Sequence, residues 1–158
     1  MVSTIIFSMS TQDIFYMFQA LEQAKKAKQS DEVPIGAILV NQGQVISRAH
    51  NLREKLGDPT AHAEIVALRE AGAKLGGWRL EGATLYVTVE PCFMCAGALI
   101  SARIFRVVFG CRDAKVGALR SLYNLGQDQR LNHQLLIEEG ILEDQCRLLM
   151  KEFFKSRR

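Results

Sequence analysis

The pattern of apolar and polar positions predicts alternating helices and strands along most of the chain. An apolar stripe through Ile14, Phe18 and Leu21 keeps helical spacing, so we expect an amphipathic helix over residues 11–29. The further predicted elements are strands at 35–40 and 44–49 joined by a turn, a helix from Asp58-Pro59 to about Leu75, a strand at 83–89, a helix at 92–103, a strand at 104–110, a short strand within 132–140 and a helix at 141–158. Helices and strands that alternate after a first hairpin predict a three-layer α/β/α fold with a mixed, about five-stranded sheet, mostly parallel after the hairpin.

Residues that favour a first helical turn mark the predicted helix starts. Asp58 suits an N-cap, Pro59 suits the first helical position, and Pro91 precedes the next predicted helix. The closing helix should bury a stripe formed by Leu142, Cys146, Leu149 and Phe153. The segment 111–130 mixes polar and apolar residues, which predicts loop with a short helix.

The composition is that of a globular protein. Of the 158 residues, 48% are apolar and 23% are charged, which predicts one domain over residues 1–158, with residues 1–10 as an N-terminal extension. The formal net charge of +3 permits a nucleic-acid partner without requiring one. The chain has no secretory signal and no run of about 20 apolar residues, so we expect a cytoplasmic protein with no membrane partner.

Two short motifs place metal-ligating side chains at predicted helix starts. His62 and Glu64 lie two residues apart in PTAHAEIVAL, and Cys92 and Cys95 are spaced i, i+3 in VEPCFMCAG. One imidazole and two thiolates are ligands that zinc takes, and three protein ligands plus a water is the pattern of catalytic zinc sites. Glu64 would then help to draw a proton from that water.

Each half of this pattern also has a structural interpretation. A single histidine near a helix start is most often a capping or packing residue, and a lone C-x-x-C is often a redox pair or half of a structural zinc site. A structural site needs a fourth protein ligand, for which the candidates are Cys111, Cys146, His50 and His133. None of these belongs to a second C-x-x-C or H-x-H pair, so the joint pattern favours a catalytic site.

H-x-E followed by P-C-x-x-C resembles the signature of the zinc nucleoside and nucleobase deaminases. Within them the chain is similar to the bacterial tRNA adenosine deaminases through EVPIGAILV, DPTAHAEIVALR, ATLYVTVEPCFMCAGALI, RVVFGCRDAKVGALRSL, NHQLLIEEGIL and FFKSRR. The resemblance implies a cytidine deaminase-like fold, a homodimer and one Zn²⁺ per chain. It also implies conversion of adenosine to inosine at wobble position 34, in the anticodon stem-loop of tRNA(Arg).

The resemblance assigns roles to individual residues. It makes His62, Cys92 and Cys95 the zinc ligands and Glu64 the catalytic residue that moves protons between the water and the base. The implied substrate-binding residues are Asn51, Val33, Pro34, Ala63 and Pro91. The amide of Asn51 can both donate to and accept from a purine edge, although a plain turn role is open for it from the residues alone.

RNA contacts are expected from basic and aromatic side chains near the C-terminus and after the fourth strand. The candidates are Asp113, Lys115, Phe154, Lys155, Arg157 and Arg158. Phe153 lies on the apolar stripe and should pack, whereas Phe154 falls beside it and suits stacking on a splayed base. A turn role is equally open for Asp113, and Cys111, where a small residue is expected, is simplest as a small buried hydrophobe.

Two other functions fit part of the pattern. A deaminase of a free base or nucleoside, such as guanine or cytosine, would share the zinc site without needing a basic C-terminal helix. A zinc-stabilised RNA-binding module without catalysis would not need Glu64. Inosine formation in tRNA distinguishes the first alternative, and the effect of Glu64→Ala on turnover distinguishes the second.

Overall fold

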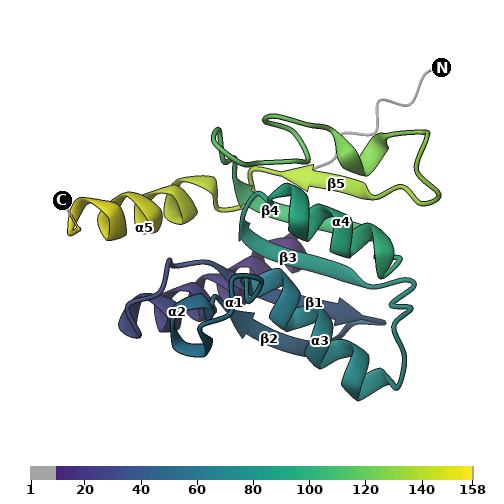
Figure 1. Cartoon of the computed structure of the whole chain (residues 1–158), viewed down its shortest axis with the longest axis horizontal. Coiled ribbons are helices and arrows are strands. Elements are labelled where there is room, and N and C mark those ends of the chain that lie inside the picture. Colours follow the sequence, from purple (N-terminus) through teal and green to yellow (C-terminus); the bar gives the residue numbers. More distant parts are fainter. Residues whose placement is uncertain (1–9, 158) are drawn as a thin grey trace.

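The computed structural model describes residues 10–157, so Arg158 and all but the last residue of the expected N-terminal extension lie outside the described residues. Within this range five strands form one sheet in the order β2-β1-β3-β4-β5 (Figure 1). The elements are α1 (Thr11–Gln29), β1 (Gly36–Asn41), β2 (Gln44–His50), α2 (Arg53–Leu56), α3 (Ala63–Leu75), β3 (Thr84–Val89), α4 (Phe93–Ser101), β4 (Arg106–Cys111), the 3₁₀ turn η1 (Leu125–Gln127), β5 (Leu136–Glu139) and α5 (Glu143–Lys155). β1 pairs antiparallel with β2 and β3, whereas β3 and β5 pair parallel with β4, which confirms the predicted mixed sheet.

Helices cover both faces of the sheet, which gives the predicted three layers. α3 and α4 pack on one face, and α1 and α5 pack on the other (Figure 1). Ala67 and Ala71 of α3 are fully buried, and such small side chains let the helix lie close to the strands. On the opposite face a Cβ at Gly36 of β1 would lie 2.0 Å from the carbonyl oxygen of Ala20, so only glycine fits under α1 there.

The core-facing side of α1 differs from the predicted stripe. Met17 and Leu21 are buried as helical spacing requires, but Phe18 is 50% exposed, so the stripe through Phe18 is wrong. A buried ion pair holds the observed rotation of the helix. Both carboxylate oxygens of Asp13 accept hydrogen bonds from the Arg106 guanidinium on β4, at 2.9 and 2.7 Å. A polar anchor of this kind leaves no periodic apolar signal in the sequence.

α3 begins later than predicted. Its first residue is Ala63 rather than Pro59, and His62 is its N-cap. Asp58 does not cap the helix, because its carboxylate accepts from the backbone N–H of Thr60 at 2.8 Å and from the Thr60 hydroxyl at 2.7 Å. Such a local side-chain turn competes with helix formation. The predicted end of the helix before the double glycine is confirmed.

The last two helices are shorter than predicted. Cys92 is the N-cap of α4 rather than a residue within it. α5 buries Cys146, Leu149 and Phe153, which confirms most of the stripe, whereas Leu142 is its half-buried N-cap with a φ of 53°. The short helix α2 was not predicted. Across residues 10–157, no helix combines the length and hydropathy of a membrane-spanning segment.

Candidate metal centre and active site

Three side chains from distant parts of the sequence converge on one point. The Nδ1 atom of His62 lies 3.7 Å from the Sγ atom of Cys92 and 3.5 Å from that of Cys95. All three ligand atoms lie within 4.8 Å of one another, and they form the single group of three or more such ligands found among residues 10–157. The structure therefore brings together the three predicted zinc ligands.

The starts of α3 and α4 position these side chains. His62 and Cys92 are N-cap residues with extended backbone, and neither side chain bonds to the free N–H groups of its own helix. Cys95 is the third residue of α4, so its thiol lies on the same side of the helix as that of Cys92. α4 begins just after the carboxyl end of β3, and the contacts of His62 with the two cysteines bring the start of α3 to the same edge of the sheet, where α/β sheets commonly bind ligands.

The donor set fits a zinc ion. With Zn–S bonds of about 2.3 Å and Zn–N bonds of about 2.0–2.1 Å, a tetrahedral ion separates sulfur from nitrogen by about 3.6 Å, and the two observed separations are 3.5 and 3.7 Å. A hydrogen bond with Cys95, followed by one with His62, lowers the pKa of Cys92 to about 4. The pKa of His62 is raised, chiefly by its hydrogen bond with Cys92. Without a metal the site thus favours one thiolate and a proton on the imidazole, while the pKa of Cys95 is raised by its hydrogen bond with Cys92. A bound Zn²⁺ would supply the positive charge in place of these protons, so these residues are assigned to one Zn²⁺ per chain.

Glu64 is the buried acid of the site. It is the second residue of α3, it is 3% exposed, and its Oε1 atom has no hydrogen-bond partner among the described residues. Burial raises the pKa of Glu64. An unpaired buried oxygen is costly, so this atom is placed to meet a group that the protein itself does not supply, such as a water or a substrate.

The predicted base-binding residues lie on segments tied to this site. Asn51 is buried; its Oδ1 atom accepts from the N–H of Arg53 at 3.2 Å, and its Nδ2 atom lies 3.5 Å from the carbonyl oxygen of Val33. The N–H of Leu52 donates to the carbonyl of Ala61 at 3.0 Å, which joins this segment to the residue before the histidine ligand. The other predicted members are buried: Pro34, Ala63 and Pro91.

Several of the predicted RNA-contacting side chains are exposed, and one of them makes contacts within the protein. The exposed ones are Lys115, Phe154 and Lys155, with Phe154 47% exposed as predicted and Phe153 buried. Arg157 is also exposed but contacts other parts of the protein: it donates to the carbonyl oxygen of Asp31 at 3.2 Å, pairs with the Asp31 carboxylate, and lies 4.0 Å from the centre of the Phe153 ring. Because Asp31 precedes Val33 by two residues, this contact places the end of α5 beside the loop of predicted base-binding residues.

Asp113 is a turn residue. Its Oδ1 atom accepts from the N–H groups of Lys115 at 3.0 Å and Val116 at 3.3 Å, and its carbonyl accepts from Gly117 at 2.8 Å. The turn interpretation of Asp113 is therefore confirmed. Contact with RNA through its second carboxylate oxygen stays a prediction.

The remaining cysteines and histidines do not join the metal site. Cys111 and Cys146 are buried in the core beneath α1 and α5, on the face of the sheet opposite α3 and α4, so Cys111 packs as a small buried hydrophobe. The His50 ring lies 3.4 Å from a glutamine oxygen of α1, and the His133 ring lies 2.7 Å from the carbonyl oxygen of Ile104. With three protein ligands among residues 10–157, the site has the catalytic zinc pattern rather than the structural one.

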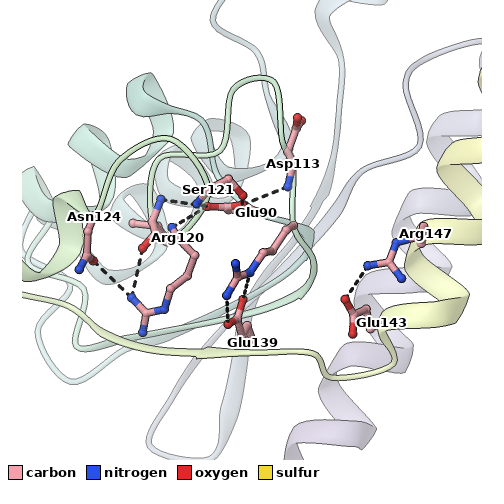
Figure 2. A network of polar contacts seen from close by, with 10 residues as sticks. Glu90, Asp113, Arg120, Ser121, Asn124, Glu139, Glu143 and Arg147 are labelled. Atoms are coloured by element: carbon pink, nitrogen blue, oxygen red, sulfur yellow. Dashed lines mark hydrogen bonds and ion pairs between the residues drawn. The ribbon is translucent and has the colours of Figure 1, made fainter.

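Two buried glutamates outside the predicted set hold loops around the site. Glu32 is fully buried, and its Oε1 atom accepts from the N–H groups of Glu54 at 2.5 Å and Lys55 at 2.9 Å in α2. Glu90 holds the segment after β4 (Figure 2). Burial opposes ionisation of Glu90, but hydrogen bonds from Ser121 and from backbone N–H groups outweigh it and lower its pKa. In the sequence, the signal for these two residues was a carboxylate within an otherwise apolar motif: EVPIGA for Glu32 and VEPC for Glu90.

Known proteins are similar to this chain in sequence and in fold. The profile of the cytidine and deoxycytidylate deaminase zinc-binding region matches residues 10–111. The tRNA-specific adenosine deaminase of Bacillus subtilis (strain 168) is 52% identical over 94% of this chain and 92% of its own. That of Aquifex aeolicus (strain VF5) is 46% identical over 91% of this chain and 95% of its own. A structure from biochemical and structural studies of A-to-I editing by tRNA:A34 deaminases has a TM-score of 0.83 at 44% identity, and covers 85% of this chain and 98% of that one.

These matches agree with the site built from the residues. The profile spans the histidine and both cysteines that converge in the structure. The two relatives match over nine-tenths of this chain and of their own lengths, so the likeness extends well beyond the zinc motif. The predicted fold and the predicted zinc ion are confirmed, and the chain belongs to the family of tRNA-specific adenosine deaminases, a branch of the proteins that share the cytidine deaminase zinc-binding region.

Proposed function

We propose that this protein is a hydrolase that converts adenosine to inosine at wobble position 34 in the anticodon of tRNA(Arg). The observation that carries the proposal is the buried carboxyl of Glu64, whose Oε1 atom has no partner among the described residues, two residues from the ligand His62. A structural zinc site has no use for such a group. The names of the relatives support adenosine in tRNA as the substrate.

Glu64 is the proton carrier of the proposed reaction. When bound, the zinc ion acts as a Lewis acid that lowers the pKa of the attacking water. Glu64 takes a proton from that water and delivers it to N1 of adenine as the water oxygen forms a bond to C6. Glu64 then takes the proton of the new C6 hydroxyl and passes it to the amino group, which leaves as ammonia while the C6 carbonyl forms, so one adenosine and one water give one inosine and one ammonia. A raised pKa suits a carboxyl that must both take and give a proton.

The base-binding pocket is assigned to the segments around the metal ligands. Val33 and Pro34 form a wall for the purine, Ala63 leaves space for it because its side chain is small, and Pro91 lines the floor beside the cysteine ligands. The contact between the Asn51 amide and the carbonyl of Val33 is long for a hydrogen bond, at 3.5 Å. The amide is therefore available to bond with the edge of a purine.

The anticodon stem-loop is the proposed macromolecular partner. A loop presents its bases without the cost of opening a duplex. The cations proposed to meet its phosphates are Lys115, Lys155, Arg157 and Arg158. Phe154 is assigned to stacking, because it is exposed beside these cations, and Asp113 to a contact with the loop backbone.

The protein is proposed to act in the cytoplasm as a homodimer. An apolar groove between α3 and α4 supports the dimer: it is lined by Ile65, Leu68 and Ala98, and Trp78 at its end is 60% exposed. Exposed apolar surface of this kind marks protein interfaces. Light scattering should give twice the chain mass, and Trp78→Lys should give monomers. A wild-type protein that is monomeric at micromolar concentration would overturn the dimer.

The decisive experiment is a deamination assay on whole tRNA. The zinc-loaded protein is incubated with tRNA(Arg), with the same tRNA carrying guanosine at position 34, and with free adenosine, guanine and cytosine, and products are identified by mass spectrometry. Inosine at position 34 alone is the expected result. Deamination of a free base without any inosine in tRNA would favour a free-nucleobase deaminase. Binding of tRNA with no product from any substrate would favour a non-catalytic module.

A further inference from the structure

The buried carboxylate of Glu90 accepts five hydrogen bonds from one loop. Its Oε2 atom accepts from the N–H of Asp113 at 3.0 Å and from the hydroxyl of Ser121. Its Oε1 atom accepts from the three consecutive N–H groups of residues 119–121, at 3.2, 2.6 and 2.8 Å. Figure 2 shows the carboxylate between the two ends of this segment, which we call the 113–121 loop.

The 113–121 loop also rests against a zinc ligand. Gly117 pairs with Cys92 through an isolated β-bridge, and the N–H of Ala118 donates to the carbonyl of Pro91 at 2.9 Å. A Cβ at Gly117 would lie 2.3 Å from Oε2 of Glu90, so the loop approaches the carboxylate as closely as glycine permits. One side chain thus holds both ends of a loop whose middle touches the metal site.

The environment of Glu90 excludes a direct role in chemistry. A carboxylate has about four lone-pair directions, and five donors already occupy its two oxygens. The side chain is 3% exposed, so it cannot itself meet RNA. Its effect on catalysis must pass through the loop that it holds.

We propose that Glu90 is a positioning residue that fixes the 113–121 loop, and with it Lys115, against the metal ligand Cys92. The functional part of this inference rests on the proposed function, in which Lys115 meets the tRNA. A loop that has lost its anchor must be ordered again each time tRNA binds. The penalty therefore falls on KM for tRNA, whereas proton transfer by Glu64 is retained once the substrate is bound.

Glu90→Gln is the sharpest test, because glutamine keeps the size of the side chain and one acceptor oxygen. That oxygen can still serve the N–H groups of residues 119–121, but the new NH₂ group faces the N–H of Asp113. Loss of a charge-assisted hydrogen bond of this kind corresponds to about a tenfold rise in KM for tRNA. Zinc should stay at one ion per chain, and kcat should change by less than about threefold.

The matched control is Glu139→Gln in the same network. It removes the ion pair with Arg112, at 2.8 and 2.7 Å, without touching the 113–121 loop (Figure 2). KM for tRNA should stay within about twofold of wild type, because exposed ion pairs contribute little. If Glu139→Gln raises KM as much as Glu90→Gln does, the rise reflects a general disturbance of this region rather than loss of the anchor, and the positioning role is wrong.

Gly117→Ala approaches the same contact from the loop. Its Cβ pushes against the carboxylate, so it should raise KM too, and the double variant with Glu90→Gln should show less than the product of the two single effects. Effects that multiply would mean that the two residues act independently, and this would overturn the proposal. If Glu90→Gln does not fold, Ser121→Ala removes one of the five donors and should give a smaller rise in KM in a folded protein.

Hydrogen exchange separates this inference from the proposed function. The N–H group of Asp113, which faces the new NH₂ group, should exchange at least about tenfold faster in Glu90→Gln than in wild type. Wild-type protein that forms no inosine in tRNA would refute the proposed function, whatever the exchange rates are. Exchange rates equal to wild type, or an unchanged KM in an active enzyme, would refute the anchoring of the loop by Glu90.

Discussion

Glu64→Gln should abolish turnover while leaving zinc and fold intact. Glutamine has nearly the same shape, so it fills the same buried volume at the start of α3. Its amide cannot carry a proton between the water and the base. General acid–base catalysis typically contributes about 10²- to 10⁴-fold, which at about 1.4 kcal/mol per tenfold is a loss of about 3–5 kcal/mol of transition-state stabilisation.

The effect of this change on stability should have the opposite sign to that of an ordinary core substitution. Glu64 is 3% exposed and its Oε1 atom is unpaired among the described residues, so ionisation carries an uncompensated cost of about 1–3 kcal/mol. Burial raises the pKa of Glu64 above its ordinary value of 4.5, so the ionised group destabilises the folded state at any pH above that value. Burial of a neutral amide costs less than burial of an ionised carboxylate. The variant should gain about 1 kcal/mol at neutral pH, or roughly 2–4 °C in Tm for a chain of this size.

Three measurements decide the outcome. Inosine formation in tRNA gives the turnover, elemental analysis gives zinc per chain, and thermal unfolding at pH 7.5 and at pH 4 gives the stability. The gain in Tm should be smaller at pH 4, because below the ordinary pKa of 4.5 Glu64 is increasingly protonated in both the folded and the unfolded state. Glu64→Ala is the control, because it removes the same proton carrier but leaves a cavity that lowers Tm. Loss of zinc from Glu64→Gln would show that Glu64 is a ligand. Turnover within tenfold of wild type would show that another group carries the proton.

Three further outcomes follow from contacts in the structure. Cys92→Ser should bind less than about one tenth of a zinc ion per chain and should unfold at a lower temperature, as elemental analysis and calorimetry will show. Asp13→Asn should lower the free energy of unfolding, measured with urea at pH 7, by about 1–3 kcal/mol. Burial alone would raise the pKa of Asp13, but its hydrogen bonds with Arg106 lower it, so the difference from wild type should shrink as the pH falls below the ordinary pKa of 3.8. Gly36→Ala should destabilise by about 1–3 kcal/mol, because its Cβ would lie 2.0 Å from the carbonyl oxygen of Ala20; unchanged urea unfolding would refute the packing argument.

The zinc ligands were predictable because their signal is local. Cys92 and Cys95 share one side of a helix start through their spacing, and His62 stands at the start of another helix, two residues before Glu64. The alternation of strands and helices similarly predicted three layers and a mixed sheet. Each half of the zinc motif, like each helix or strand, is a pattern of neighbouring residues in which periodicity and spacing carry information, and the joint occurrence of the two halves then favoured a catalytic site.

The features that the sequence did not reveal depend on choices between partners. Asp58 could cap a helix or close a turn with Thr60, and both use the same carboxylate oxygens. Either side of α1 could face the sheet until the ion pair between Asp13 and Arg106, 93 positions apart, selected one. The role of Glu90 likewise needs donors 23 to 31 positions away. No local pattern ranks such alternatives.

Glu64 and Glu90 show how one residue type takes opposite tasks in one site. Both are 3% exposed, so burial alone would raise both pKa values. Glu64 has an oxygen without a protein donor, and its pKa is raised, whereas donors from the 113–121 loop lower the pKa of Glu90. A carboxyl with a raised pKa takes up a proton more readily than an ordinary glutamate, while a carboxylate held ionised by five donors keeps its hydrogen bonds and the loop attached to them. Environments that push two pKa values apart give two carboxyls different roles. Glu64 and Glu90 should therefore not be able to exchange roles. A carboxyl that must gain and lose a proton cannot hold the loop, and a carboxylate whose oxygens are saturated by donors cannot carry a proton.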